Sequence, residues 1–148
     1  MREIKFRGKK VESGLWTTGY LVRCDGRAWI LHPEGIATSY RKKEIFGKAE
    51  EWKAIILPRV FVVEVIPETI GQFTGLYDID RTEVYEGDII DTGYDKWIVK
   101  FGNGSFYATI PNTSFFLDLS REIINYYEIK VIGNIYDNPE LIEELSKK

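Results

Sequence analysis

Hydrophobic and polar residues alternate with a period of two along much of the chain, a pattern typical of β-strands that bury one face. Two such stretches, Leu15–Arg23 and Arg27–Leu31, flank the dipeptide Asp25-Gly26. Because Asp and Gly tolerate a positive φ at both turn positions, this dipeptide predicts a type I′ hairpin. Its expected cross-strand pairs are Cys24 with Arg27, Val22 with Trp29 and Tyr20 with Leu31.

A second hairpin is predicted where Lys96–Phe101 and Ser105–Ile110 flank Gly102-Asn103-Gly104. With Asn103-Gly104 as the central pair, the strands align Phe101 with Phe106, Val99 with Ala108 and Trp97 with Ile110. One face of the hairpin is then entirely apolar, whereas the other mixes apolar and polar side chains. A register shift of one residue would destroy that separation, so we expect the apolar face to lie in the core.

Further strands follow from runs of β-branched and aromatic residues. Arg59–Ile66 (RVFVVEVI) is a nearly continuous run of this kind and predicts a strand that is covered on both faces. Asp88–Asp91 and Glu128–Asn134 predict shorter strands. The chain is therefore expected to be mainly β.

Few segments favour a helix. Asn138-Pro139-Glu140 supplies an N-cap residue, a proline at the first helical position and an acid in the first turn, which predicts a short C-terminal helix. A second helix is predicted within Thr38–Trp52, capped by Thr38 or Ser39 and ending at Gly47.

Charge is distributed unevenly along the 148 residues. Residues 1–58 carry 12 basic and 7 acidic side chains, and residues 59–148 carry 8 basic and 16 acidic ones. The two halves can attract each other or the matching patch of a neighbouring subunit, and a basic half also suits nucleic acid. The change of sign near Pro67 marks a possible boundary between a β-rich part, 1–66, and a second part, 67–148, although both fit one continuous domain, 1–148.

Candidate catalytic chemistry is sparse. Cys24 and His32 are the only residues of their kinds, but the predicted hairpin places them on opposite faces, where a nucleophile and its base cannot meet. We therefore expect a structural Cys24 that is at least half-buried, and a surface His32 at a strand end. Without a phosphate-binding glycine motif or a catalytic cluster, the sequence predicts a protein that is not an enzyme and uses no cofactor.

The only carboxylate cluster lies in residues 78–91. Counted from Asp78, a calcium loop needs glycine at position 6 and glutamate at position 12, but Glu83 and Ile89 stand there. One Cys and one His cannot complete a structural zinc site. We expect no metal site and interpret Asp78–Asp80 and Glu86-Gly87-Asp88 as turns.

Basic residues interleaved with Phe6 and Trp16 form the candidate contact surface for nucleic acid or a protein partner. Its members are Arg2, Lys5, Arg7, Lys9, Lys10, Arg41, Lys42 and Lys43. The N-terminus lacks the apolar region of a signal peptide, and the apolar runs are far shorter than the ~20 residues that span a bilayer. We therefore expect a cytoplasmic protein that makes no membrane contact.

Four stretches together resemble the YopX family of phage and prophage proteins. They are Met1–Gly8 (MREIKFRG), Gly14–Leu21 (GLWTTGYL), Pro67–Ile90 (PETIGQFTGLYDIDRTEVYEGDII) and Val131–Leu141 (VIGNIYDNPEL). They span nearly the whole chain in the family's order. The chain departs from the family before the phrase YEGD, where members tend to read D-x-N-G and this chain has Asp78-Ile79-Asp80-Arg81-Thr82. We expect a different conformation of the turn at 78–82.

The resemblance implies a mostly β fold with a small SH3-like barrel, which agrees with the short strands and tight hairpin predicted in residues 86–134. It also implies a phage-derived protein in the cytoplasm of a bacterial host, without an established activity or known catalytic residues. We therefore expect an all-β protein with an SH3-like barrel in its C-terminal half, a β-rich N-terminal part and a short C-terminal helix.

Small barrels of this kind bind peptides, nucleic acid or copies of themselves, so the fold alone gives no function. The expected role is that of a non-enzymatic phage accessory protein, which acts by binding another phage or host protein or by assembling into a homo-oligomer. The alternative is nucleic-acid binding through the basic N-terminal half.

Overall fold

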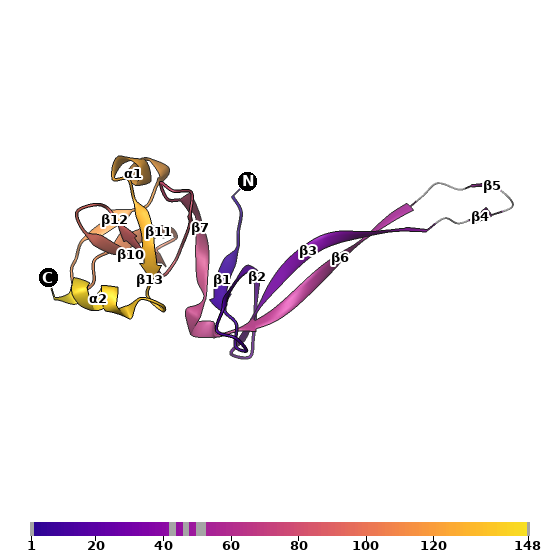
Figure 1. Ribbon diagram of the computed structural model, residues 1–148, viewed down its shortest axis with the longest axis horizontal. Helices are drawn as coiled ribbons and strands as arrows, with labels where there is room; N and C mark the ends of the chain where they lie inside the picture. Colours follow the sequence, from indigo (N-terminus) through magenta and orange to yellow (C-terminus); the bar gives the residue numbers. More distant parts are fainter. Residues whose placement is uncertain (1, 42–43, 46–47, 50–52, 148) are drawn as a thin grey trace.

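The protein is mainly β, as the sequence predicts, and most of its strands belong to two antiparallel sheets accompanied by two short helices (Figure 1). The computed structural model describes residues 2–41, 44–45, 48–49 and 53–147, with side chains at residues 2–32 and 61–147. The elements are, in chain order, β1 (Phe6–Lys9), β2 (Trp16–Cys24), β3 (Arg27–Arg41), β4 (Glu44–Ile45), β5 (Lys48–Ala49), β6 (Lys53–Val65), the 3₁₀ turn η1 (Pro67–Thr69), β7 (Gly71–Tyr77), β8 (Glu83–Tyr85), β9 (Asp88–Asp91), β10 (Lys96–Gly102), β11 (Ser105–Thr109), β12 (Phe116–Asp118), α1 (Arg121–Tyr126), β13 (Lys130–Asn134) and α2 (Pro139–Ser146).

The six-stranded sheet joins the two halves of the sequence. Its strand order is β6-β3-β2-β1-β7-β8, so β1 lies between its hairpin partner β2 and the distant strand β7. Phe6 of β1 pairs with both Gly19 and Gln72. The sheet therefore continues across the change of charge near Pro67.

The hairpin of β2 and β3 forms with the predicted turn and register. Asp25 and Gly26 have φ values of 51° and 76°, and the pairs from Tyr20↔Leu31 to Cys24↔Arg27 are those expected from the turn. Strand β3 is much longer than predicted, and it pairs with β6 as far as Arg41↔Lys53. The two strands form a ribbon that extends away from the rest of the protein (Figure 1).

The helix predicted within Thr38–Trp52 is wrong. Thr38–Arg41 is the end of β3, residues 44–45 and 48–49 form the short strands β4 and β5, and the rest of the segment lies outside the described residues. Residues 37–40 instead pair with residues 54–57 of β6, which include the β-branched residues Ile55 and Ile56 that favour a strand, so pairing overrides the local capping signal.

The strand predicted at Arg59–Ile66 is present as the end of β6, but the prediction that both its faces are covered is wrong. Phe61 and Val62 are 50% and 59% exposed, whereas Val65 is fully buried. Val62 lies on the uncovered face of the sheet, whereas Phe61 shares the face of Val65 but lies further along the ribbon, beyond the small core.

That small core lies on the inner face of the curled sheet. Ala28, Ile30 and Val65 are completely buried there, with Leu21 and Ile70 packed against them. An isolated bridge between Lys10 and Val65 brings the end of β6 back to the end of β1. Gly8 makes this possible, because a Cβ at its position would lie 3.0 Å from Cβ of Val65.

The opposite face of the same strands carries apolar side chains that nothing else in the described chain covers completely. By register they are neighbours, and Tyr20 is 60% and Val22 46% exposed. We call this the outer apolar face: Tyr20, Val22, Trp29, Leu31 and Val62.

The five-stranded sheet has the order β12-β11-β10-β9-β13 and is open, so the described residues form no closed barrel of the SH3-like kind. Its β10–β11 hairpin has the predicted register, with Asn103 and Gly104 at φ values of 51° and 79°. Val99 and Ala108 are fully buried, as expected. Phe101, however, is 44% exposed near the end of the hairpin, where its ring packs at 4.8 Å against that of Phe106.

Both faces of the five-stranded sheet are covered. On one face, Ile90, Val99 and Ala108 share a core with Val84, Ile124 and Ile129. On the other face, Lys96 forms an ion pair of 3.0 Å with Glu144, which ties α2 to the side of the sheet that also carries the buried Ile98. This sheet and its helices are the thicker, better-covered part of the protein.

The two helices differ in how well the sequence predicts them. Helix α2 begins at Pro139 after the N-cap residue Asn138, as expected. Helix α1 was not predicted; it is capped by the hydroxyl of Ser120, which accepts a hydrogen bond of 3.2 Å from the backbone N–H of Ile123. No helix among the described residues is long and apolar enough to cross a membrane.

Candidate functional site

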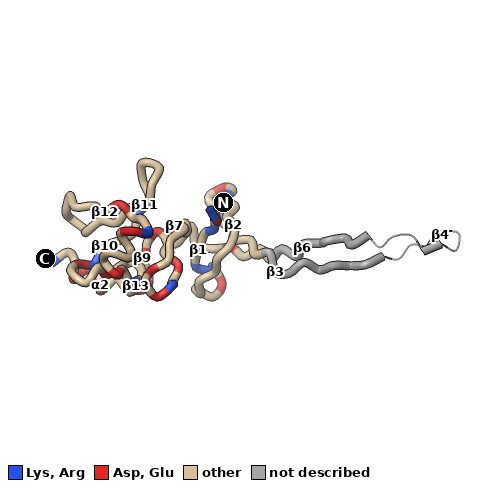
Figure 2. Tube along the Cα trace, turned by 90° about the horizontal axis from the view of Figure 1, so that it is seen from above, with Lys and Arg blue, Asp and Glu red and all other residues tan. Residues whose placement is uncertain are grey.

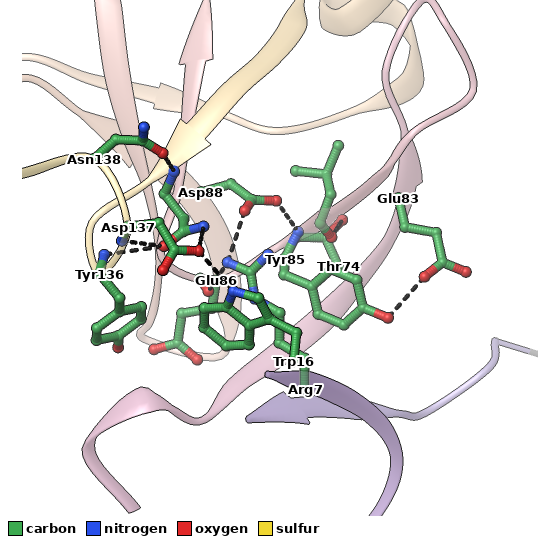
Figure 3. A network of polar contacts seen from close by, with 12 residues as sticks. Arg7, Trp16, Thr74, Glu83, Tyr85, Glu86, Asp88, Tyr136, Asp137 and Asn138 are labelled. Carbon is green, nitrogen blue, oxygen red and sulfur yellow. Dashed lines mark hydrogen bonds and ion pairs between the residues drawn. The ribbon is translucent and has the colours of Figure 1, made fainter. Parts of the chain in front are cut away.

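A network of charged and aromatic side chains joins β1 to the loops of the C-terminal half (Figure 3). Because side chains alternate along β1, Gly8 faces the inner core while Arg7 and Lys9 point to the other side of the sheet. Figure 2 shows the acidic segments gathered around β9, β13 and α2, next to the basic segments of β1. The two oppositely charged halves therefore meet within one chain.

Arg7 is the centre of this network. Its guanidinium lies 2.7 Å from Oδ1 of the buried Asp88 and donates a weaker hydrogen bond of 3.4 Å to the backbone carbonyl of Glu86. The guanidinium also lies over two aromatic rings, with Cζ of Arg7 4.8 Å from the ring centre of Trp16 and 4.9 Å from that of Tyr85. A planar cation between two aromatic faces is well suited to a partly desolvated ion pair.

Asp88 occupies the turn that the sequence predicts at Glu86-Gly87-Asp88. Its Oδ2 accepts a hydrogen bond of 2.7 Å from the backbone N–H of Tyr85, and Gly87 has a φ of 90°, which favours glycine. Burial raises the pKa of the Asp88 carboxyl group, while the charge of Arg7 and the two hydrogen bonds lower it, and the net direction is upward. Arg7 therefore favours the ionised form of Asp88 against the effect of burial.

Lys9 and Trp16 meet at a second carboxylate, Asp137. Lys9 Nζ forms an ion pair with Oδ1, and the indole N–H of Trp16 donates to Oδ2 over 2.7 Å. The side-chain amide of Asn134 donates to the same Oδ2 over 3.0 Å. Hydrogen bonds from Lys9, Trp16 and Asn134 lower the pKa of Asp137 to about 2.

A third ion pair joins Lys5 to Glu83 of β8. The phenol of Tyr85 donates a hydrogen bond of 2.7 Å to the other oxygen of Glu83. Burial acts to lower the pKa of Lys5, but hydrogen bonding to Glu83 and its charge outweigh this and raise the pKa. Burial acts to raise the pKa of Glu83, but Lys5 and Tyr85 bring it below its usual value.

The loop that carries Asp137 is shaped by close contacts between the side chain of Asn138 and the backbone. Asn138 Oδ1 accepts a hydrogen bond of 3.2 Å from the backbone N–H of Asn134, although Asn138 is also the N-cap residue of α2. A Cβ on Gly133 would lie 2.4 Å from this oxygen, so only glycine fits there. Tyr136 of the same loop packs at 5.9 Å against Trp16.

The predicted contact residues thus lie in different surroundings. Lys5, Arg7 and Lys9 form ion pairs within the chain, and Arg2 lies over the ring of Phe106 at 5.5 Å. Lys10 is half-buried beside the bridge to Val65. Arg41 ends β3, and Lys42 and Lys43 lie outside the described residues. The structure thus brings Lys5, Arg7 and Lys9 together, but acidic residues of the same chain neutralise their charges.

Cys24 and His32 remain apart, because the register puts them on opposite faces of the hairpin. Cys24 is exposed, so the prediction of a half-buried thiol is wrong. His32 lies in the middle of the long strand β3 and its Nε2 is hydrogen-bonded to the hydroxyl of Thr17, so the expected place at a strand end is also wrong. No group of three or more His, Cys, Asp or Glu that could hold a metal occurs among the described residues.

Sequence reasoning missed the acidic partners Glu83, Asp88 and Asp137 as members of one site. A signal was present, because the four stretches that resemble the YopX family supply nearly the whole network, and each contributes at least one residue. Arg7 comes from the first stretch, Trp16 from the second, Asp88 from the third and Asp137 from the fourth.

Fold and site together define a class: a mainly β protein of two open antiparallel sheets, joined by a charged network between its first strand and its last turns. The family model described as YopX protein matches residues 5–143, and the chain belongs to the YopX family. No curated protein matches the chain significantly. The solved structure of protein EF1440 from Enterococcus faecalis is similar in fold, with a TM-score of 0.51, 21% sequence identity, and coverage of 96% of this chain and 99% of that one.

Proposed function

We propose that the protein acts by binding, without catalysis, and that its first partner is a second copy of the same chain. The observation that carries this proposal is the outer apolar face. Tyr20, Val22 and Val62 are each roughly half exposed on adjacent strands of one sheet face. Contiguous exposed apolar surface of this kind is typical of interaction sites.

The ribbon of β3 and β6 supports a second copy as the partner. Strand β2 pairs with β3 only through Arg27–Leu31, and beyond this point β3 pairs, within the described chain, only with β6. An isolated two-stranded ribbon is marginally stable in water, and its open edges favour pairing with another strand. Two identical ribbons can pair edge to edge around a two-fold axis, which places their outer apolar faces side by side on one surface of a continuous sheet.

The charge pattern supports this more than it supports nucleic acid. Binding of nucleic acid by the basic N-terminal half requires cations that are free to contact phosphates. Lys5, Arg7 and Lys9 instead neutralise carboxylates of their own chain. The setting implied by the family is the cytoplasm of a bacterial host, where the protein acts as a phage accessory protein.

Light scattering on the full chain tests the proposal. We expect a homo-oligomer for the wild type, and a shift to monomer for the double variant Tyr20→Lys, Val62→Lys with an unchanged circular dichroism spectrum. Phe116→Lys on β12 is the matched control, because Phe116 is 68% exposed in the other sheet. A monomeric wild type, or a double variant that assembles like the control, contradicts the proposal.

A further inference from the structure

A second surface of the protein is polar and basic, in contrast to the outer apolar face. A hollow of about 490 Å³ between β7, the turn that follows it and α1 is lined by Gly75, Leu76, Tyr77, Arg81, Arg121 and Asn125. We call it the arginine pocket. Its lining contains two arginines and no acid, although residues 59–148 as a whole are acidic.

Both arginines are available. Arg81 and Arg121 are exposed, and neither forms an ion pair with any described residue. The carboxylate beside Arg81 in the sequence, Asp80, lies 3.5 Å from Lys130 instead. Arg2 approaches the margin, because a Cβ on Gly75 would lie 3.3 Å from Cγ of Arg2.

The backbone that presents these arginines is fixed. The buried Asp78 accepts hydrogen bonds of 2.9 Å and 2.8 Å from the N–H groups of Asp80 and Thr82, which locks the turn that contains Arg81. Arg81 has a φ of 65°, a left-handed conformation that costs a branched or long side chain more than it costs glycine. Arg121 stands in the first turn of α1, where the helix dipole disfavours a cation.

Each arginine thus occupies a position that local structure disfavours, and both line the same hollow. Hydrogen bonds from its own backbone N–H and from the hydroxyl of Ser120, and then the charge of the neighbouring Arg121, lower the pKa of Glu122, but neither guanidinium group is held in an ion pair with a described residue. Together the two groups match the charge and the paired acceptor oxygens of a phosphate group. Tyr77, which is 48% exposed, supplies an aromatic surface in the same pocket, and Asn125 supplies an amide. Its volume is within the usual range of small-ligand sites.

We propose that the arginine pocket binds a nucleotide unit, with the phosphate on Arg81 and Arg121 and the base stacked on Tyr77. A free nucleotide and one unit of a single strand share this chemistry. The site differs from the basic N-terminal segment, whose cations are paired within the chain, and it does not depend on the proposed self-association.

Fluorescence titration of the full chain with a labelled single-stranded oligonucleotide of about ten nucleotides tests the proposal, beside competition by a nucleoside monophosphate and by inorganic phosphate. The double variant Arg81→Gly, Arg121→Gln should lose at least about tenfold in affinity per arginine, as expected for hydrogen bonds to charged groups. Glycine suits the left-handed position, so this variant should melt no lower than the wild type.

The salt dependence gives an independent reading, because each lost phosphate contact on a single strand reduces the slope of log affinity against log salt by about 0.7. Arg23→Gln is the matched control, since Arg23 is an exposed arginine of β2 outside the pocket. Tyr77→Leu should lower the affinity for the oligonucleotide and for the nucleotide but leave the affinity for inorganic phosphate unchanged. If the nucleoside monophosphate competes, a free nucleotide is sufficient as the ligand. If the oligonucleotide binds and the monophosphate does not compete, the ligand is a nucleic-acid single strand.

Absence of oligonucleotide and nucleotide binding by the wild type overturns the proposal. Equal affinities of the double variant and the Arg23→Gln control overturn it as well, because binding would then depend on charge elsewhere on the protein.

Discussion

The two sheets of this protein contrast in how they are covered. The five-stranded sheet has α1 and the buried side chain of Val84 against one face and α2 tied to the other. The six-stranded sheet is covered on both faces only around β7 and β8, and at β2, β3 and β6 its outer apolar face remains exposed. The difference indicates that stability resides mainly in the five-stranded sheet, while the six-stranded sheet provides surface for contacts and is held in place by the network of Arg7.

The largest effect is expected where the two sheets are joined. Replacing Arg7 with Met leaves Asp88 buried without its counter-charge, and we expect a loss of about 3–5 kcal/mol in the free energy of unfolding at neutral pH. Arg23→Met removes an exposed arginine and is the control.

The pH dependence of this loss has a defined sign. Without Arg7, the pKa of Asp88 rises further, so the folded state favours the protonated carboxyl group more strongly than the unfolded state does. Stability relative to the wild type should then decrease as the pH rises from about 4 to 7. Urea titrations at several pH values check this, and a pH-independent difference would show that Asp88 is not the affected group.

A direct comparison of the two sheets comes from truncating one aliphatic side chain in each. Ile90→Ala, in the core of the five-stranded sheet, should cost about 2–5 kcal/mol because Ile90 is completely buried. Val62→Ala, on the outer apolar face, should change the stability of the monomer by less than about 0.5 kcal/mol. Denaturant titration at low protein concentration measures both, and similar losses would mean that the outer face is covered in the monomer.

A smaller effect is expected at the rim of the network, at Asp137. Its pKa is about 2 in the folded protein and 3.8 as an ordinary aspartate, so its contribution is fully present above about pH 4 and is lost as the pH falls towards 2. Because the side chain of Asp137 is 38% exposed, solvent screening reduces this contribution to about 1 kcal/mol. Asp137→Asn should remove this acid-dependent step, whereas Asp118→Asn, an exposed aspartate of β12, should leave it intact.

The smallest effect is expected at Cys24. This thiol is exposed and has no base beside it, because His32 lies on the other face and is bonded to Thr17. We expect alkylation at about the rate of a free cysteine, and Cys24→Ser to change the melting temperature by less than about a degree. A much faster reaction would reveal an activating group that the structure does not place there.

The sequence predicted the parts of the fold that depend on local chemistry. Both hairpins formed in the expected register because Asp25-Gly26 and Asn103-Gly104 determine their turns within a few residues. The start of α2 followed from Asn138 and Pro139 in the same way. Local chemistry also gave one wrong prediction, because the helix expected from the capping residue Thr38 is replaced by strand pairing between β3 and β6.

The remaining features depend on contacts between distant residues. The unequal charge of the two halves suggested their attraction, but nothing in the pattern paired Arg7 with Asp88 or Lys9 with Asp137. The exposure of Phe61 and Val62 could not be predicted either, because an apolar run reveals neither how many faces of a sheet are covered nor how far the core extends along a strand. Helix α1 was missed since its six residues are too short for a clear period.

The position of β1 in the middle of the six-stranded sheet has a consequence for the order of events during synthesis. The hairpin partner β2 leaves the ribosome soon after β1, but Lys5 and Glu83 are 78 residues apart and Lys9 and Asp137 are 128 residues apart. Contacts of such long sequence separation form late in folding. Lys5 and Arg7 remain solvated until Glu83 and Asp88 have been made, and Lys9 remains solvated until the turn around Asp137 emerges. The ion pairs that hold β1 therefore form in two stages, and the pair of Lys9 forms last.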